Sequence, residues 1–252
     1  MLRHHRILRN ALTQQESGTR SSTSLSSVKP TTTLGETQTP DGSRFLLLEH
    51  DGNFYFKFNG TQLMSSDWTE SELLLADEAC RFRKKKAAPR VLVGGLGLGF
   101  SLKRVLELVD AQAEVWVAEL LPDVVRWNRE HLQALNGKLL DEQRVKVFTG
   151  DVYDCLRKQG SSYFDAILMD VDNGPTALVQ PQNARLYDKR GLHLFYEALR
   201  PEGRVSFWAS DPEPAFPGQL KKAGFLVEEL PAKAHPRAKR FAHRLYTGEK
   251  RT

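Results

Sequence analysis

Short apolar runs alternate with stretches of helical period along the chain downstream of Pro89. A run of four to eight apolar residues bounded by polar or turn residues is typical of a buried strand. This pattern predicts seven strands, at residues 90–93, 114–118, 144–148, 164–169, 204–208, 225–229 and 240–246. It predicts helices between most of them, including residues 101–108, 122–135 (with a proline in the first turn) and 188–199.

The predicted strands leave little polar surface to face water. The segments "VLV" at 91–93 and "AILM" at 166–169 are wholly apolar, as strands covered by helices on both faces require. Strands that alternate with helices in this way define the α/β class. The sequence therefore predicts a Rossmann-like, doubly wound domain over residues 88–252, with a mostly parallel seven-stranded sheet in three layers.

A different pattern precedes this domain. Residues 35–59 predict two strands, with "DG" and "NG" as hairpin turns, and residues 71–82 take helical spacing. We therefore expect residues 35–87 to form a small β-rich lead-in.

Residues 1–34 are rich in Ser, Thr and Arg and nearly free of acids. That composition fits an organelle transit peptide and equally fits a disordered extension. The expected location is accordingly cytoplasmic, or organellar (mitochondrion or plastid) if the segment is a transit peptide.

Composition and charge narrow the classes of function. The 252 residues are 40% hydrophobic, and no apolar run approaches the roughly 20 residues that cross a bilayer, so we expect a soluble protein with no membrane partner. The two cysteines are too few for a disulfide framework and fit a reducing compartment. The net charge of +5 comes from the two ends of the chain, and the body is net acidic, so no nucleic-acid partner is predicted. The histidines show no metal-ligand spacing, and no metal is expected.

The stretch "RVLVGGLGLGF" places Gly94, Gly95, Gly97 and Gly99 directly after the first predicted strand of the domain. In a doubly wound sheet, ligands lie at the carboxyl ends of the strands, where the first loop offers unpaired backbone N–H groups. Glycines let this loop bend sharply and let a ligand approach the backbone. The loop is predicted to bind a nucleotide-like group.

Acidic residues at the ends of the next three strands define the ligand further. Glu119 ends the second strand, 20 residues beyond Gly99, where a carboxylate accepts hydrogen bonds from a ribose diol. Asp151 follows the third strand and Asp170 the fourth. An acid after the third strand suits an adenine amino group, which favours an adenosyl sulfonium over NAD.

From about Thr39 onward the chain resembles the spermidine synthase (aminopropyltransferase) family, within the class I S-adenosylmethionine-dependent methyltransferase superfamily. The resemblance rests on the hairpin lead-in, "GGLGLG", Glu119, "GDVYD", "DVDNGP" and "LYDKRGLHLFYEALRPEGRVSFW". It implies that Glu119 binds the ribose hydroxyls, Asp151 the adenine and Asp170 the amine nucleophile. It also implies a small-molecule amine as substrate, and leaves open whether a homodimer forms through the lead-in.

In the reaction implied by the resemblance, an amine attacks decarboxylated S-adenosylmethionine and releases methylthioadenosine. An alkylamine has a pKa of about 10, so a carboxylate must hold the ammonium and take its proton. Asp170, with Asp172 two residues on, is the predicted base. Tyr187 is a candidate for the acceptor pocket.

Two departures from the family pattern keep other functions open. The family motif "GGGDGG" carries an Asp that pairs with the donor's aminopropyl ammonium, and Gly97 stands in the corresponding place. The family's Tyr-Gln pair is absent, and Trp68, Glu70 and Glu72 occur in that region instead. One alternative is a methyltransferase that uses intact S-adenosylmethionine on a small molecule, and a second is a catalytically silent adenosyl-binding protein.

Overall fold

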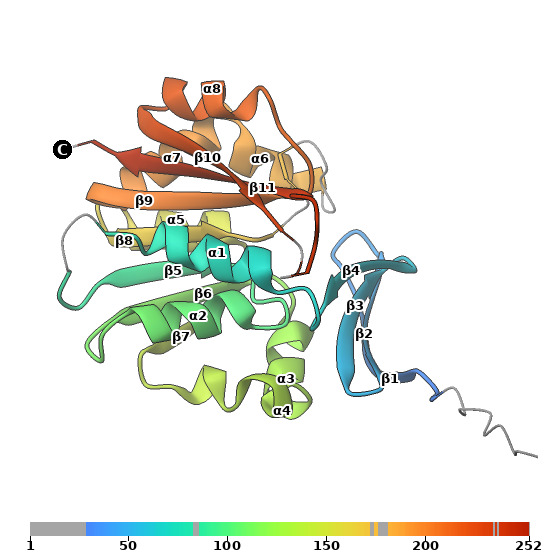
Figure 1. Ribbon diagram of the computed structural model, residues 1–252. Coiled ribbons are helices and arrows are strands. Elements are labelled where there is room, and N and C mark those ends of the chain that lie inside the picture. The colour runs from blue at the N-terminus through green and yellow to red at the C-terminus, as the bar shows by residue number, and fades with distance from the viewer. Residues whose placement is uncertain are drawn as a thin grey trace, which may run out of the picture.

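The computed structural model describes residues 29–82, 86–171, 174–175, 181–233, 235 and 237–251, which form two sheets and the helices around them (Figure 1). The larger sheet has seven strands in the order β10-β11-β9-β8-β5-β6-β7. All neighbouring pairs are parallel except β9–β11 and β10–β11. The strands are β5 (Arg90–Gly94), β6 (Glu114–Glu119), β7 (Val145–Thr149), β8 (Phe164–Met169), β9 (Leu199–Ala209), β10 (Phe225–Ala232) and β11 (His243–Lys250). The prediction of a mostly parallel seven-stranded sheet is confirmed.

Helices cover both faces of this sheet and create two hydrophobic cores. On one face lie α1 (Glu70–Ala79), α2 (Phe100–Leu108) and α3 (Pro122–Glu130); on the other lie α5 (Val152–Gln159), α7 (Lys189–Ala198) and α8 (Phe216–Lys222). The short elements are α4 (Gln133–Asn136), η1 (Leu139–Asp141), η2 (Pro181–Asn183) and α6 (Ala184–Tyr187). The helix predicted over 122–135 is therefore interrupted between α3 and α4. The longest described helices have ten residues, half the length that a bilayer demands.

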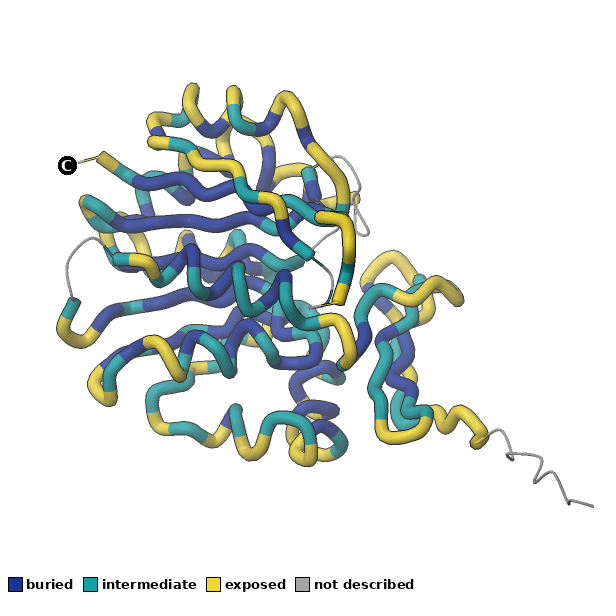
Figure 2. Tube along the Cα trace, viewed as in Figure 1, coloured by how far each residue is buried: buried dark blue, intermediate teal, exposed yellow. Residues whose placement is uncertain are grey.

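Alternate residues of the central strands face the two cores. In β8, Ala166 and Leu168 contribute to the core under α1 and α2, whereas Ile167 and Met169 contribute to the core under α5 and α7. All six residues of β8 are buried, and the central strands are the most buried part of the molecule (Figure 2). Burial on both faces explains why an almost wholly apolar run forms a strand here.

The smaller sheet is an antiparallel meander of β1 (Thr32–Gln38), β2 (Arg44–His50), β3 (Asn53–Phe58) and β4 (Thr61–Ser65). Its "DG" and "NG" turns have positive φ at both central residues, 52° and 81° at Asp51 and Gly52 and 46° and 84° at Asn59 and Gly60. That backbone is the one that two-residue hairpins favour, because its twist matches that of the strands. The sequence predicted only two strands over 35–59, and the structure has four in this sheet. The more polar β1 and β4 are strands as well, because they pair with β2 and β3.

An aromatic cluster joins the smaller sheet to the helical layer. The ring of Trp127 in α3 is 99% buried and lies parallel to that of Phe45, with centroids 6.2 Å apart, and 6.0 Å from that of Phe56. Gly35 of β1 lies so close to the indole that any Cβ there would collide with it.

The predicted boundary of the leader at residue 34 was too late. β1 starts at Thr32, and Leu34 packs against the core, so these residues belong to the fold. Pairing with β2 orders a sequence that looked like part of a polar leader. Residues 1–28 of the predicted leader lie outside the described residues.

Deleting residues 1–28 is expected to leave the melting temperature unchanged, because a segment of this composition has little apolar surface to offset its ordering entropy. Deleting residues 1–38 is expected to lower it by several degrees, because the pairing of β1 with β2 and the contact of Leu34 are lost. Scanning calorimetry of both variants measures this. Equal melting temperatures for the full chain and the 1–38 deletion would contradict the role given to β1.

Candidate active site

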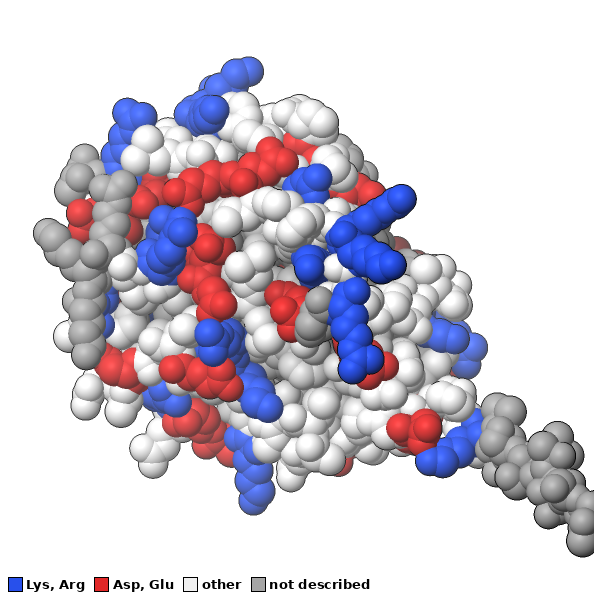
Figure 3. Space-filling view, viewed as in Figure 1, with Lys and Arg blue, Asp and Glu red and all other residues white. Residues whose placement is uncertain are grey.

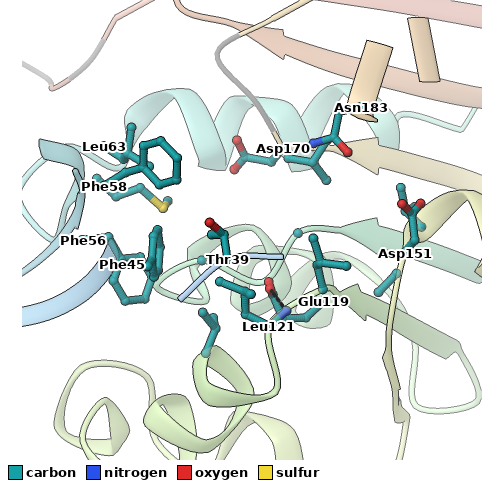
Figure 4. Close-up of a pocket in the computed structure, with 18 of the residues that line it drawn as sticks. Thr39, Phe45, Phe56, Phe58, Leu63, Glu119, Leu121, Asp151, Asp170 and Asn183 are labelled. Carbon is teal, nitrogen blue, oxygen red and sulfur yellow. Dashed lines mark hydrogen bonds between the residues drawn. The ribbon is translucent and has the colours of Figure 1, made fainter. Parts of the chain in front are cut away.

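A cavity of about 190 Å³ lies between the carboxyl ends of the parallel strands and the smaller sheet (Figure 4). Its floor is made by residues at or just beyond the ends of four strands, namely Gly95, Glu119, Asp151 and Asp170. Its opposite wall comes from the smaller sheet and is largely apolar, with Phe45, Phe56, Phe58, Leu63 and Met64. Three further residues line the cavity, namely Glu72 of α1, Asn183 and Trp208 of β9.

The four glycines of the loop after β5 have different roles. Gly95 and Gly97 line the cavity, whereas Gly94 and Gly99 are buried away from it. Gly94 ends β5, and Gly99, at a φ of 92°, is the N-cap of α2. Two of the four predicted glycines therefore line the cavity, and the binding role of all four stays a prediction.

Gly95 is required by sterics as well as by its backbone angle. Its φ is 89°, and a Cβ there would collide with the carbonyl oxygen of Asp170. Gly97 has a φ of 52°, and a Cβ there would lie 2.8 Å from the sulfur of Met64. Met64 thus lies next to the position at which the family motif carries its Asp.

Glu119 is a buried carboxylate that holds the glycine loop. It is 8% exposed, and its two oxygens accept hydrogen bonds from the backbone N–H groups of Leu96 (2.9 Å) and Leu121 (2.8 Å). Burial raises its pKa, and the backbone hydrogen bonds oppose that rise. The carboxylate also lines the cavity, and its oxygens are acceptors of the kind that a ribose diol needs.

Asp151 is engaged at both of its oxygens. One caps α5 by accepting from the backbone N–H of Tyr153 at 2.7 Å, and the other pairs with Arg185 at 2.7 Å. The guanidinium of Arg185 in turn lies over the ring of Tyr153, 4.7 Å from its centroid. The helix cap fixes the direction of this carboxylate at the edge of the cavity.

Asp170 and Glu72 form a pair of neighbouring carboxyl groups. Burial raises the pKa of Asp170 to about 6. The hydroxyl of Ser101, which lies 3.5 Å from a carboxyl oxygen of Asp170, opposes this rise. Burial, and then the charge of Asp170, raise the pKa of Glu72 to about 8; the Ser71 hydroxyl, which donates to Glu72 at 2.7 Å, opposes this. Two carboxylates that share a poorly solvated space cannot both ionise readily. Asp172, the other predicted base, lies outside the described residues.

The structure places Tyr187 away from the cavity. It is 6% exposed and packs in the core between the rings of Phe207 and Phe216, at centroid distances of 6.1 and 5.9 Å. It does not line the cavity, whereas Asn183, four residues earlier, does. The aromatic ring of Tyr187 on this short helix packs in the core, and its place in an acceptor pocket stays a prediction.

Three site residues gave no clear signal in the sequence. Glu72 was one of several acids in a helical segment, and Trp208 lies within a predicted strand, where an aromatic residue gives no signal of a site. Trp208 lines the cavity, and its indole Nε1 is shielded from solvent without a hydrogen-bond partner among the described residues. Asn128 of α3 donates to the carbonyl oxygen of Gly97 at 2.9 Å and so supports the loop from outside the cavity. Only the tertiary arrangement identifies these roles.

The charge of the cavity differs from that of the outer surface. Among its described lining residues, the ionisable side chains are Glu72, Glu119, Asp151 and Asp170, and none is Lys, Arg or His. On the outer face in Figure 3, Lys and Arg side chains are interspersed with Asp and Glu. The cavity is therefore selectively acidic.

Two curated relatives match part of the chain. Polyamine aminopropyltransferase 2 of Streptomyces coelicolor is 32% identical over 123 residues, which cover 48% of this chain and 21% of that protein. An uncharacterized protein of Methanocaldococcus jannaschii is 25% identical over 154 residues, which cover 57% of this chain and 49% of that protein. The chain thus spans about a fifth and about half of the lengths of these relatives. No protein-family model matches it.

Solved structures match most of the chain. The strand order and these matches define a class I methyltransferase-like fold. Within that class, the fold is that of the spermidine synthases. A spermidine synthase in complex with the transition state analogue AdoDATO has a TM-score of 0.69 at 21% identity, covering 86% of this chain and 73% of that one. The spermidine synthase of Thermotoga maritima has a TM-score of 0.67 at 18% identity, covering 86% and 72%. The predicted resemblance is confirmed at the level of fold.

Gly95→Ala is expected to destabilise the fold by about 3 kcal/mol or more, because it adds a steric clash with Asp170 to the strain of a positive φ. Gly42→Ala is the matched control, since Gly42 has a φ of 83° but no atom near its missing Cβ. It should cost only about 1 kcal/mol. Denaturant unfolding measures both, and equal losses would contradict the close approach of the loop to Asp170.

The stability of the protein should fall as the pH rises from about 5 to about 8. The folded-state pKa of Glu72, about 8, lies above its ordinary value of 4.5, so the folded state holds a proton that the unfolded state releases in this window. Glu72→Gln removes that proton and keeps the shape. The variant should match the wild type at pH 5 and melt at a higher temperature at pH 8.5. A difference in melting temperature that does not change with pH would contradict the raised pKa.

Proposed function

We propose that this chain is an aminopropyltransferase that moves the aminopropyl group of decarboxylated S-adenosylmethionine to a small primary amine such as putrescine. The observation that carries the proposal is the selectively acidic cavity at the carboxyl ends of the parallel strands. Its four carboxyl groups come from α1 and from the ends of three strands, and none of the described lining residues is Lys, Arg or His.

The charge of the donor separates the two related reactions. Decarboxylated S-adenosylmethionine carries a sulfonium and an ammonium group, and both are positive. The intact form adds a carboxylate, which would lose its hydration beside other carboxylates without a cation to pair with. The amine acceptor is also a cation at neutral pH. An acidic cavity therefore favours the decarboxylated donor and the amine together.

Three of the four acidic residues are assigned separate roles. Glu119, at the end of β6, accepts hydrogen bonds from the ribose diol. Asp151 lies at the edge where the resemblance implies the adenine. Asp170 binds the attacking amine and takes its proton, and its raised pKa of about 6 makes it a better base than an ordinary carboxylate.

In the proposed step, the amine nitrogen forms a bond to the methylene carbon beside the sulfur. The carbon–sulfur bond breaks, its electron pair stays on sulfur, and methylthioadenosine leaves as a neutral thioether. The proton of the amine goes to the carboxylate. The rest of the rate comes from holding nitrogen, carbon and sulfur in line.

Methyl transfer from intact S-adenosylmethionine is a second candidate, and one observation favours it. Gly97 offers no carboxylate to an aminopropyl ammonium, and Met64 lies beside the place where one would stand. Incubating the protein with each donor and a panel of polyamines, with products identified by mass, separates the two reactions. Aminopropylated product supports the proposal and methylated product supports the alternative; no product with either donor would favour a silent binding protein.

Asp170→Asn is expected to lower single-turnover transfer by roughly 10²–10⁴-fold, because it removes a general base but keeps the shape of the side chain. Binding of methylthioadenosine should be retained, since Glu119 and Asp151 are unchanged. The exposed Asp154→Asn is the matched control and should transfer at the wild-type rate. Near-normal turnover in Asp170→Asn would exclude Asp170 as the base, and joint loss of folding and binding would give it a structural role.

A further inference from the structure

Glu72 is a buried carboxyl group that points to a function beyond the fold. It is the third residue of α1, it is 8% exposed, and it lines the cavity. The other buried acid of this helix, Glu78, lies in an ion-pair cluster with Arg81 and Arg204. Among the described residues, no Lys, Arg or His lies within ion-pair distance of Glu72. The helix dipole favours an acid in the first turn of α1, but that structural role does not require the carboxyl group to line the cavity.

Two carboxyl groups and the hydroxyls next to them surround this part of the cavity. Asp170, just beyond β8, lines the same cavity as Glu72. Ser71 donates to Glu72, and Ser101 of α2 donates to Asp170. The polar side chain of Asn183 lines the same cavity. Phe58, Leu63, Met64 and Trp208 supply the apolar lining of the same cavity. Figure 4 shows Asp170 between the aromatic and aliphatic end of the cavity and the end that holds Glu119 and Asp151.

From this arrangement we infer that Glu72 and Asp170 act as one unit that binds the ammonium group of a primary alkylamine and holds the proton that the amine must lose. This inference rests on the proposed function and deepens it. It assigns to α1 a substrate-binding carboxylate that the glycine loop lacks at Gly97. The apolar lining suits the alkyl chain that carries the ammonium group.

The titration of the pair supports this role. At neutral pH the pair holds one proton, because burial and mutual repulsion keep both groups from ionising. An ammonium group between them supplies the missing positive charge. Both groups can then ionise, and the proton leaves to solvent.

The same pair makes the later proton transfer easier. Transfer from an ammonium with a pKa of about 10 to a carboxylate with an ordinary pKa near 4.5 is unfavourable by about 10⁶-fold. With an acceptor whose pKa is about 8, as burial and Asp170 give Glu72, the same transfer is unfavourable by only about 10²-fold. The amine then attacks as a neutral nucleophile, and the pair again holds one proton.

Calorimetry with putrescine tests the inference without requiring turnover. The titration is made in the presence of methylthioadenosine, in two buffers that differ in ionisation enthalpy, so that the number of protons released on binding is measured. The wild type is expected to release close to one proton at pH 7 and close to none at pH 9, where the pair is already ionised. Release that does not change with pH, or no binding of putrescine, would overturn the inference.

Two variants of α1 separate Glu72 from a general effect of charge. Glu72→Gln is expected to bind putrescine at least tenfold more weakly at pH 7 and to release markedly fewer protons. Glu70→Gln, two residues away on a side of the helix that does not line the cavity, should behave as the wild type. Proton release in Glu72→Gln equal to that of the wild type would remove Glu72 from the pair.

The pH profile of transfer distinguishes a failure of this inference from a failure of the proposed function. If the wild type transfers the aminopropyl group, its rate should rise with pH toward about 8. In Glu72→Gln, this rising limb of the pH–rate profile should move to lower pH. An unmoved limb with active enzyme would contradict the role of Glu72 alone. Absence of transfer by the wild type would contradict the proposed function, while the calorimetric result would still decide whether the pair binds an ammonium.

Discussion

The enclosure of four carboxyl groups in one cavity is the constraint on which the site depends. A buried carboxylate is costly unless hydrogen bonds or a cation compensate for its lost hydration. Glu119 is compensated by two backbone N–H groups, and Asp151 by a helix cap and Arg185. Glu72 and Asp170 are compensated less well. The hydroxyls of Ser71 and Ser101 donate to them and a backbone N–H supports Glu72, yet burial still raises both pKa values. This pair is where a cationic substrate would bind most favourably.

The fold supplies this constraint from both sides. Parallel strands bring their carboxyl ends to one edge of the sheet, so residues as far apart in the chain as Gly95 and Asp170 meet there. The smaller sheet then covers that edge with apolar side chains, held in place by the contact of Trp127 with Phe45 and Phe56. Without this cover, the carboxyl groups would be hydrated and their pKa values would return toward ordinary values.

Parts of the structure that depend on local pattern could be predicted from the sequence. All seven strands of the large sheet occur near their expected positions, and the central ones are clearest because they are buried apolar runs between turn residues. The same pattern shows where each strand ends, so the positions of Glu119, Asp151 and Asp170 at the cavity could be predicted. The position of Glu72 depends on how α1 packs against β8 and β9, and that of Tyr187 on which face of α6 meets the core; neither has a local signature. The extent of the smaller sheet was missed for a similar reason, since β1 is ordered by its partner strand.

The most direct test of the account compares the two donors at the same site. Decarboxylated and intact S-adenosylmethionine differ only in one carboxylate, so their affinities, measured by titration calorimetry at neutral pH and constant ionic strength, report the charge preference of the cavity. The account predicts that the decarboxylated donor binds at least about tenfold more tightly, because like charges in a poorly solvated site repel. Equal affinities, or tighter binding of the intact donor, would contradict it.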